Sequence, residues 1–182
     1  EGDPFTDLAL QKSISRIKSR GIFKNVNSEV ITGSDNSLKK INIIVEEKPT
    51  GEIAAGAGIG TNGGSFAIQI SENNWLGEGK KVGLELEIDK ESIIGQLSYI
   101  NPNYNFLGNS ISYNVASERN DKPNQGYENS IISSSIRTSF EQYKDLNANL
   151  GLLLSVDDLQ TDGSASATLK KQDGTFSEIT GI

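Results

Sequence analysis

Acidic side chains recur at alternate positions in one segment of the chain, at Glu85, Glu87 and Asp89. Alternate positions of a strand share one face, so these carboxylates could form a metal site or supply general acids. The chain has no histidine and no cysteine, which removes the commonest general base and the thiolate metal ligands. We therefore interpret the three carboxylates as solvated charges on a wet interior surface. We predict that the chain is not an enzyme and has no catalytic residues, no metal site and no other cofactor.

Two further groups of polar residues could in principle do chemistry. Ser133, Ser134 and Ser135 are adjacent, but no histidine is present to activate a serine nucleophile. Asp157 and Asp158, with the pair Asp162 and Gly163 near a polar loop, could contribute oxygen ligands to a calcium site. Nothing else in the sequence supports that calcium site, and we do not assign it.

The glycines of residues 51–63 have the spacing of a dinucleotide-binding loop, Gly58-Ile59-Gly60-Thr61-Asn62-Gly63. That chemistry needs a helix directly after the loop to hold the pyrophosphate. Residues 65–71 instead alternate as a strand, so we reject nucleotide binding. Gly56, Gly58 and Gly60 leave one strand face almost bare. Either another element packs closely there, or the strand is weakly held at a seam, and the sequence leaves both open.

Composition favours an extended, non-helical membrane protein or a soluble β protein. The net charge of −7 argues against a nucleic-acid partner. Mean hydropathy is −0.40, and no apolar run is long enough for a transmembrane helix. Barrel strands alternate apolar and polar residues, so their mean hydropathy resembles that of soluble proteins. The chain contains no methionine and ends on what reads as an unfinished strand, so we expect a fragment of a longer protein.

The first part of the chain predicts a small α+β module. Residues 1–21 have helical periodicity and end at Gly21, and strands are expected at 23–31 and 38–47 with a turn at 33–36. One helix on two strands is too small a core to stand alone. Residues 48–51 break the pattern. We predict domains at 1–49 and 50–182.

The second part predicts about eight antiparallel strands. In residues 82–89 the even positions are aliphatic and three of the odd ones are acidic, which is the period of a strand. The expected strands are 51–60, 64–74, 80–90, 92–101, 106–118, 128–140, 145–157 and 173–182. Residues 117–127 and 159–171 read as longer loops. The band expected to face lipid is Ile53, Ile59, Phe66, Ile68, Val82, Leu84, Leu86, Leu150 and Leu152. The opposite face carries Glu85, Glu87, Asp89, Gln96, Asn147 and Asn149.

The pattern indicates a transmembrane barrel more strongly than a soluble sandwich or lipocalin-like barrel. A soluble β domain usually has shorter strands and fills its interior with large apolar side chains. The aromatic residues lie mostly near the ends of the predicted strands, as interfacial girdles do. They are Trp75, Tyr99, Tyr104, Tyr113, Tyr127 and Tyr143.

Several motifs resemble those of one family. Residues 1–5, 13–17 and 21–26, with the step Gly21-Ile22-Phe23-Lys24-Asn25-Val26, are similar to the second helix and following strand of a POTRA domain. Residues 45–51 resemble the exit from the last POTRA domain into a barrel, and residues 172–176 a later barrel strand. Asn74, Leu76, Gly77 and Gly79 match a family turn after the second barrel strand. Together these resemble the BamA family of outer-membrane β-barrel assembly factors.

The resemblance implies a fold and a function. Residues 1–49 would be the C-terminal part of the last periplasmic POTRA domain, and residues 50–182 the N-terminal half of a barrel in the bacterial outer membrane. The family inserts barrel proteins into that membrane, and an incoming strand would add to the edge of the first barrel strand by β-augmentation. The residues of that edge are Gly51, Ile53, Ala55, Gly56, Ala57, Gly58, Ile59 and Gly60.

The implied partners are unfolded outer-membrane proteins, assembly-complex lipoproteins that bind the POTRA module, and outer-membrane lipid. Transporters of the same superfamily, for two-partner secretion or from the translocation and assembly module, remain the first alternative. A soluble β-rich binding domain is the second.

Overall fold

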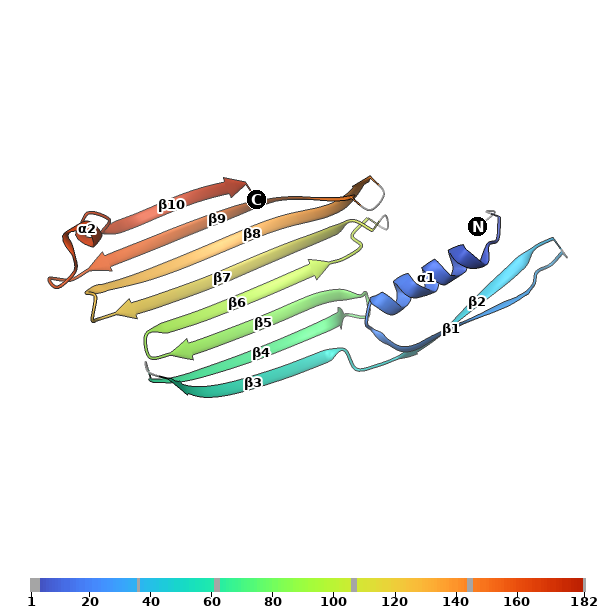
Figure 1. Cartoon of the computed structure of the whole chain (residues 1–182), viewed down its shortest axis with the longest axis horizontal. Coiled ribbons are helices and arrows are strands. Elements are labelled where there is room, and N and C mark those ends of the chain that lie inside the picture. Colours follow the sequence, from blue (N-terminus) through green and yellow to red (C-terminus); the bar gives the residue numbers. More distant parts are fainter. Residues whose placement is uncertain (1–3, 36, 61–62, 106–107, 144–145, 182) are drawn as a thin grey trace. The chain divides into compact units, whose positions relative to one another are not determined.

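The computed structural model describes residues 4–35, 37–60, 63–105, 108–143 and 146–181. The chain forms two compact units, Glu1–Thr50 and Gly51–Ile182 (Figure 1). Six predicted features fall in part outside the described residues: the first residues of the POTRA resemblance, Asn36 of the turn at 33–36, Thr61 and Asn62 of the glycine loop, and the strand limits at 106, 145 and 182. No helix among the described residues is long and apolar enough to cross a membrane.

The first unit consists of helix α1 (Asp7–Ser19) and strands β1 (Phe23–Thr32) and β2 (Lys39–Glu47). Thr6 caps α1, because its hydroxyl oxygen accepts a hydrogen bond from the Ala9 N–H at 3.2 Å. Gly21 ends the turn after α1 with a φ of +70°, a conformation that glycine adopts without strain. β1 and β2 pair in antiparallel fashion, and the small core is built on Ile22 and Val26.

The second unit is one antiparallel sheet of eight strands, in the order β10-β9-β8-β7-β6-β5-β4-β3 (Figure 1). Every strand therefore pairs with its neighbours in sequence. The bounds are β3 Gly51–Gly60, β4 Gly63–Trp75, β5 Lys80–Asp89, β6 Ser92–Asn101, β7 Ser110–Lys122, β8 Tyr127–Tyr143, β9 Leu146–Thr161 and β10 Gly174–Gly181. The prediction of a mainly β protein with eight antiparallel strands is confirmed.

Two predicted loops are wrong in extent. β7 runs to Lys122 and β8 starts at Tyr127, so the loop expected over 117–127 is reduced to a turn at 123–126. The loop expected over 159–171 starts later, because β9 runs to Thr161, and it contains the short helix α2 (Ala167–Lys170). Both strand extensions carry polar residues on both faces, so they lack the apolar alternation that marks a strand in the sequence.

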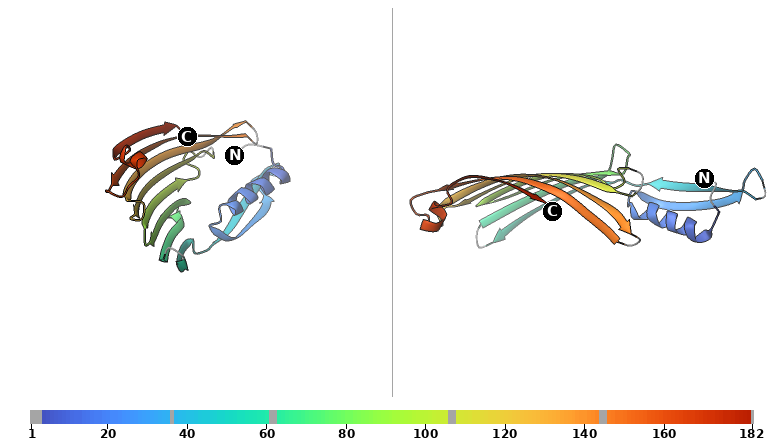
Figure 2. Two further views of the ribbon diagram at one scale, coloured as in Figure 1. Left: turned by 60° about the vertical axis from the view of Figure 1, so that its left-hand side comes forward. Right: turned by 90° about the horizontal axis from the view of Figure 1, so that it is seen from above.

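The two faces of the sheet differ in composition and in exposure. Figure 2 shows that the sheet is curved. Along β7 the side chains at 113, 115, 117, 119 and 121 are exposed and those between them are half-buried, which assigns the first set to the convex face. Directly paired residues of antiparallel strands share a face. The pairing register therefore extends this assignment to every strand.

Candidate functional site: a two-faced sheet and its open edge

The middle of the convex face is mainly apolar. One row of directly paired residues, called here the convex row, consists of Ile53, Ile70, Leu84, Leu97, Val115, Ser134, Leu154 and Ile179. Leu97 is 52 % exposed and Leu154 50 %. All nine residues of the predicted lipid-facing band lie on this face.

The second unit, which contains this sheet, has almost no apolar interior among its described residues. Among the described residues, the only buried apolar side chains are Ile22, Val26 and Ala165, and the first two belong to the other unit. A soluble sandwich would place the apolar face of its sheet in a core. Here the apolar face is the convex, exposed one, which is the arrangement of a barrel surrounded by lipid.

The concave face is polar over the same strands. The row of residues one position away, called here the concave row, consists of Ala54, Gln69, Glu85, Gln96, Ala116, Ser133, Ser155 and Glu178. Glu85 is paired between Gln69 and Gln96, and Glu87 between Ala67 and Ile94. The concave face thus has the chemistry of a water-facing wall.

Asp89 serves the turn between β5 and β6 rather than a site. Its carboxylate accepts hydrogen bonds from the N–H groups of Glu91 and Ser92, each at 2.7 Å, and from the Ser92 hydroxyl at 2.7 Å. Within the described part of the chain, no three histidine, cysteine or acidic residues come together as a metal site. Of the three acidic residues, Glu85 and Glu87 therefore lie on the concave face of β5, and Asp89 stabilises the β5–β6 turn.

The other polar candidates are separated in the same way. Ser134 lies in the convex row and Ser133 in the concave row, so the serine triplet is split between two environments. Asp158 accepts a hydrogen bond from the Thr175 hydroxyl at 2.7 Å, and Asp162 accepts two from Ser164 at 2.6 Å. Both carboxylates are therefore engaged in local structure, which leaves the calcium interpretation without support.

β3 forms one open edge of the sheet, because its only pairing among the described residues is with β4. Every second residue of such a strand directs its N–H and C=O away from the sheet. Gly51, Ile53, Ala55, Ala57 and Ile59 carry the convex face of this strand. Ile59 is 94 % exposed and Ile53 73 %.

The glycines of β3 lie on the concave face, and the fold does not require them there. Gly56, Gly58 and Gly60 all have negative φ angles. A Cβ atom would meet nothing within 4 Å at Gly56 or Gly60, and only the Ser65 hydroxyl at 3.1 Å at Gly58. Close packing by an element of the described chain therefore does not explain them. Glycine weakens a strand by about 0.5–1 kcal/mol relative to alanine, which favours a weakly held edge.

The glycine spacing of residues 58–63, for which nucleotide binding was rejected, leads into strand β4 from Gly63 onward and not into a helix. No helix N-terminus is therefore available for a pyrophosphate, as the sequence indicated.

The turn between β4 and β5 is closed by the side chain of Asn74. Its oxygen Oδ1 accepts a hydrogen bond from the Gly79 N–H at 2.7 Å, and its carbonyl accepts one from the Gly77 N–H at 2.9 Å. Gly77 and Gly79 have φ angles of +74° and +67°, and Leu76 has +56°. These left-handed conformations explain why the family turn has glycine at the positions of Gly77 and Gly79. The left-handed leucine is a feature that the sequence did not reveal.

One corner of the second unit is packed. The Asp162 N–H donates to the Gly126 carbonyl at 2.9 Å, which brings the β9–β10 loop onto the β7–β8 turn. Gly126 has a φ of +72°, and a Cβ atom there would clash with the Ser164 hydroxyl and with the Ala165 nitrogen. Ala165 is 7 % exposed. Sequence reasoning missed this contact because it joins residues from two different loops.

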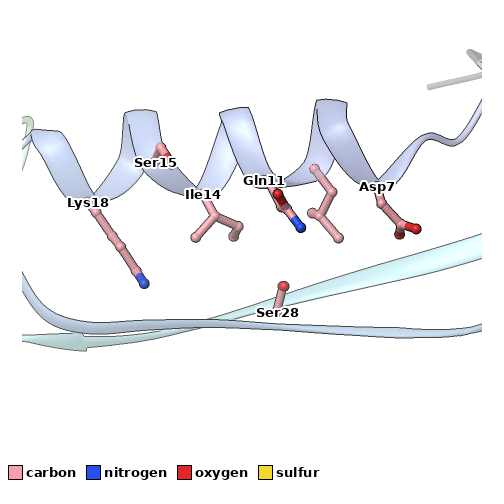
Figure 3. Close-up of a pocket in the computed structure, with 7 residues that line it drawn as sticks. Asp7, Gln11, Ile14, Ser15, Lys18 and Ser28 are labelled. Carbon is pink, nitrogen blue, oxygen red and sulfur yellow. The ribbon is translucent and has the colours of Figure 1, made fainter.

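The first unit has a shallow cavity of about 390 Å³ between α1 and β1 (Figure 3). Its lining residues are Asp7, Leu10, Gln11, Ile14, Ser15, Lys18 and Ser28. On the β1–β2 hairpin, Glu46 has a pKa below its ordinary value because Lys24 and Asn25 donate hydrogen bonds to it. The lining mixes apolar and polar groups without a nucleophile–base pair.

The comparison with family models decides the family. The model of the Omp85 superfamily domain matches residues 74–181, more than half of the chain. The chain belongs to the Omp85 superfamily.

Individual Omp85 relatives point in the same direction. The outer membrane protein assembly factor BamA of Neisseria meningitidis serogroup B is 27 % identical over 159 residues, 86 % of this chain. BamA of Neorickettsia risticii is 28 % identical over 183 residues, 96 % of this chain. The chain spans only 18 % and 24 % of the lengths of these relatives.

A solved structure gives the same fold for the Omp85 chain. BamA of Haemophilus ducreyi, crystallised without POTRA domains 1–3, matches with a TM-score of 0.77 over the whole chain and 37 % of its own length, at 23 % identity. The eight-stranded sheet matches half of the BamA barrel. The resemblance to BamA inferred from the sequence motifs is confirmed.

Proposed function

We propose that this chain contributes the first half of an outer-membrane barrel that assembles and inserts other barrel proteins. The observation that carries the proposal is the sheet with an apolar convex face, a polar concave face and a glycine-rich open edge at β3. The relatives are named as outer membrane protein assembly factors. A sheet with open edges is unstable in hydrocarbon, because its unpaired backbone groups find no water there. The proposal therefore includes a second half-barrel that completes the wall.

The open edge of β3 is the proposed working site. An incoming strand would pair with the outward N–H and C=O groups of Gly51–Gly60, with the convex-face residues Ile53, Ala55 and Ala57 next to lipid. Backbone hydrogen bonds supply affinity in β-augmentation without reading a particular sequence. The glycines at 56, 58 and 60 keep this strand weakly held, so a partner strand can be exchanged. This chemistry uses strand exchange alone, with no catalytic residue or cofactor.

The first unit is the proposed end of a periplasmic POTRA domain. α1 followed by the β1–β2 hairpin has the element order that the sequence motifs implied. In this proposal residues 1–49 lie in the periplasm, where the module binds lipoproteins of an assembly complex. Unfolded outer-membrane proteins and outer-membrane lipid are the other partners.

Disulfide trapping at β3 tests the proposal. Single cysteines would replace Ile53, Ala55 and Ala57 in the whole protein that carries this sequence, and a stalled barrel substrate would carry cysteines along its last strand. We expect crosslinks at β3 whose pairing advances by two substrate residues for each step of two along β3. Leu84, in the convex row but inside the sheet, is the matched control and should give none. Equal crosslinking at Leu84, or none at β3 during successful assembly, would refute the edge mechanism.

A superfamily transporter gives a different result in the same experiment. Its cargo passes through the barrel, so crosslinks would form on the concave face, at Gln96 and Ala116, and not at the edge of β3. The match to the Omp85 superfamily domain does not by itself distinguish the two functions, and the position of the crosslinks separates them.

A further inference from the structure

The turn between β4 and β5 holds a leucine in a conformation that leucine rarely adopts. Leu76 has a φ of +56°, the only positive φ of a non-glycine residue among those described. This left-handed region is sterically unfavourable for side chains with a Cβ atom, and glycine or asparagine adopts it far more readily. The leucine side chain is also 78 % exposed. Local backbone structure and burial therefore both disfavour leucine at this position.

The turn is fixed by bonds that do not involve the leucine side chain. Besides the two bonds to Asn74, the Glu78 N–H donates to the Trp75 carbonyl at 3.2 Å. The Asn74 N–H donates to the Glu72 carboxylate at 2.6 Å. The turn thus presents Leu76 on a stable frame, and a strained residue held in this way points to a functional contact outside the turn.

The neighbouring residues show the chemistry of that contact. Lys80 is two positions before Val82 on β5 and so shares its convex face; an irregularity of the β4 register between Glu72 and Trp75 brings Trp75 opposite Lys80, on the same face. Trp75 is 45 % exposed, and Lys80 forms an ion pair with Glu78. Tryptophan and lysine with apolar neighbours are typical of the boundary between acyl chains and headgroups, where each finds both an apolar and a polar environment.

Two tyrosines lie on the convex face, toward the same end of the sheet as Trp75 and Lys80. Tyr99 is paired with Val82 on one side and with Tyr113 on the other, and the two rings lie 6.0 Å apart at 44°. At the opposite end of the convex face the side chains are charged, with Arg119 bound to Glu128 at 2.8 Å and 3.0 Å. Trp75, Tyr99 and Tyr113 therefore lie toward the end of the convex face where the turn lies, whereas the exposed aromatic residue near the opposite end is Phe66, which has no polar group.

We propose that Trp75 and Leu76 anchor this end of the barrel in the phospholipid interface, with Leu76 inserted among the headgroups and upper acyl chains. The proposal rests on the proposed function in one respect, that the convex face contacts lipid. Adjacent Cα atoms are about 3.8 Å apart, so Leu76 stays within the interfacial layer that Trp75 marks. Continuity with the apolar convex face favours lipid over a protein surface as the occupant.

Depth-dependent quenching of Trp75 tests the anchor. Trp75 is the single tryptophan of this chain, and in the whole protein any others would be replaced by phenylalanine. The protein would be reconstituted in phosphatidylcholine vesicles brominated either near the headgroup or deep in the acyl chains. We expect stronger quenching by the shallow bromines. Leu76→Asn tolerates the positive φ but removes the apolar side chain, and should lower the shallow quenching about twofold by loosening the interfacial contact.

Two controls make the outcome specific. Leu38→Asn changes another exposed leucine, in the β1–β2 turn of the first unit, and should leave Trp75 quenching unchanged. Leu97→Trp in a Trp75→Phe background reports on the middle of the convex row and should be quenched most by deep bromines. The thermal midpoint of Leu76→Asn should equal or exceed that of the parent, because the substitution relieves strain.

The results separate the two proposals. Quenching of Leu97→Trp without quenching of Trp75, or with Trp75 quenching unaffected by Leu76→Asn, overturns the anchor and leaves the lipid-facing barrel in place. Blue-shifted Trp75 emission that lipid bromine does not quench would assign the pair to a protein surface, which also overturns the anchor. Absence of quenching at both positions overturns the membrane-embedded barrel and the anchor together.

Discussion

The convex row and the concave row run across the same eight strands, one residue apart. The side chains of the convex row suit an apolar medium, and those of the concave row suit water. The convex row carries seven aliphatic residues and Ser134, and the concave row carries Gln69, Glu85, Gln96 and Glu178 among small residues. In β7, β8 and β9 the convex side chains are more exposed than the concave ones, so burial does not determine where the apolar residues of these strands lie. In the proposed barrel the medium on each side determines it, with lipid outside and water inside.

The largest expected effect comes from placing a charge in the convex row. Leu97→Arg puts a cation near the middle of the apolar face, and should destabilise the folded barrel by about 2–4 kcal/mol. Gln96→Arg, one residue away in the concave row, should change stability by less than about 0.5 kcal/mol, as surface substitutions usually do. The measurement is the urea dependence of the heat-modifiable folded band in lipid vesicles. Equal losses for the two variants would contradict the assignment of the faces.

A smaller effect is expected at the packed corner, where the β9–β10 loop contacts the β7–β8 turn. The stability of this corner does not depend on which medium contacts the two faces of the sheet. Gly126→Ala forces a side chain into the left-handed region and against the Ala165 backbone, and should cost about 1–3 kcal/mol of local stability. The β9–β10 loop would then open, so trypsin should cut faster at Lys170 or Lys171. Gly163→Ala is the matched control in the same loop, because a Cβ atom there would meet nothing within 4 Å. Equal cutting rates in both variants would mean that the corner is not close-packed.

The smallest effect concerns the pH dependence of this loop. The Ser164 hydroxyl and N–H donate hydrogen bonds to Asp162 and hold the pKa of Asp162 below its ordinary value of 3.8. A lowered folded-state pKa means that the stabilisation is complete above the ordinary value and is lost as the pH falls through the lowered one. Amide exchange at Ser164, corrected for intrinsic rates, should therefore lose protection below about pH 4. Asp162→Asn should abolish that pH dependence, and its persistence in this variant would exclude Asp162 as the titrating group.

The strands were predictable from the sequence where the two solvents differ. Between Val82 and Asp89 every second side chain is aliphatic and lies on the convex face, so the residue types alone show the period of two. The prediction failed at residues 119–122, where both faces of the extended strand carry polar groups. A strand with polar groups on both sides has the composition of a loop, and only its pairing with β8 shows that it is a strand.

The candidate sites were predictable to a lesser degree. The glycines of β3 and the turn at Asn74 could be located from residue types alone. The meaning of Leu76 could not, because a leucine in a turn carries no sign of its φ angle in the sequence. The short helix α2 was missed for a related reason. Four residues are too few for a helical period, and Ser166 caps the helix within a loop whose conformation depends on contacts with another turn.

The sequential order of the sheet has a consequence for how it forms. Each pairing joins strands that are consecutive in the chain, so every step closes a short loop and the entropy lost at each closure is small. Such a low contact order favours rapid zipping from one hairpin to the next. β3 can therefore be added last or peeled away first while the register of the other seven strands is preserved.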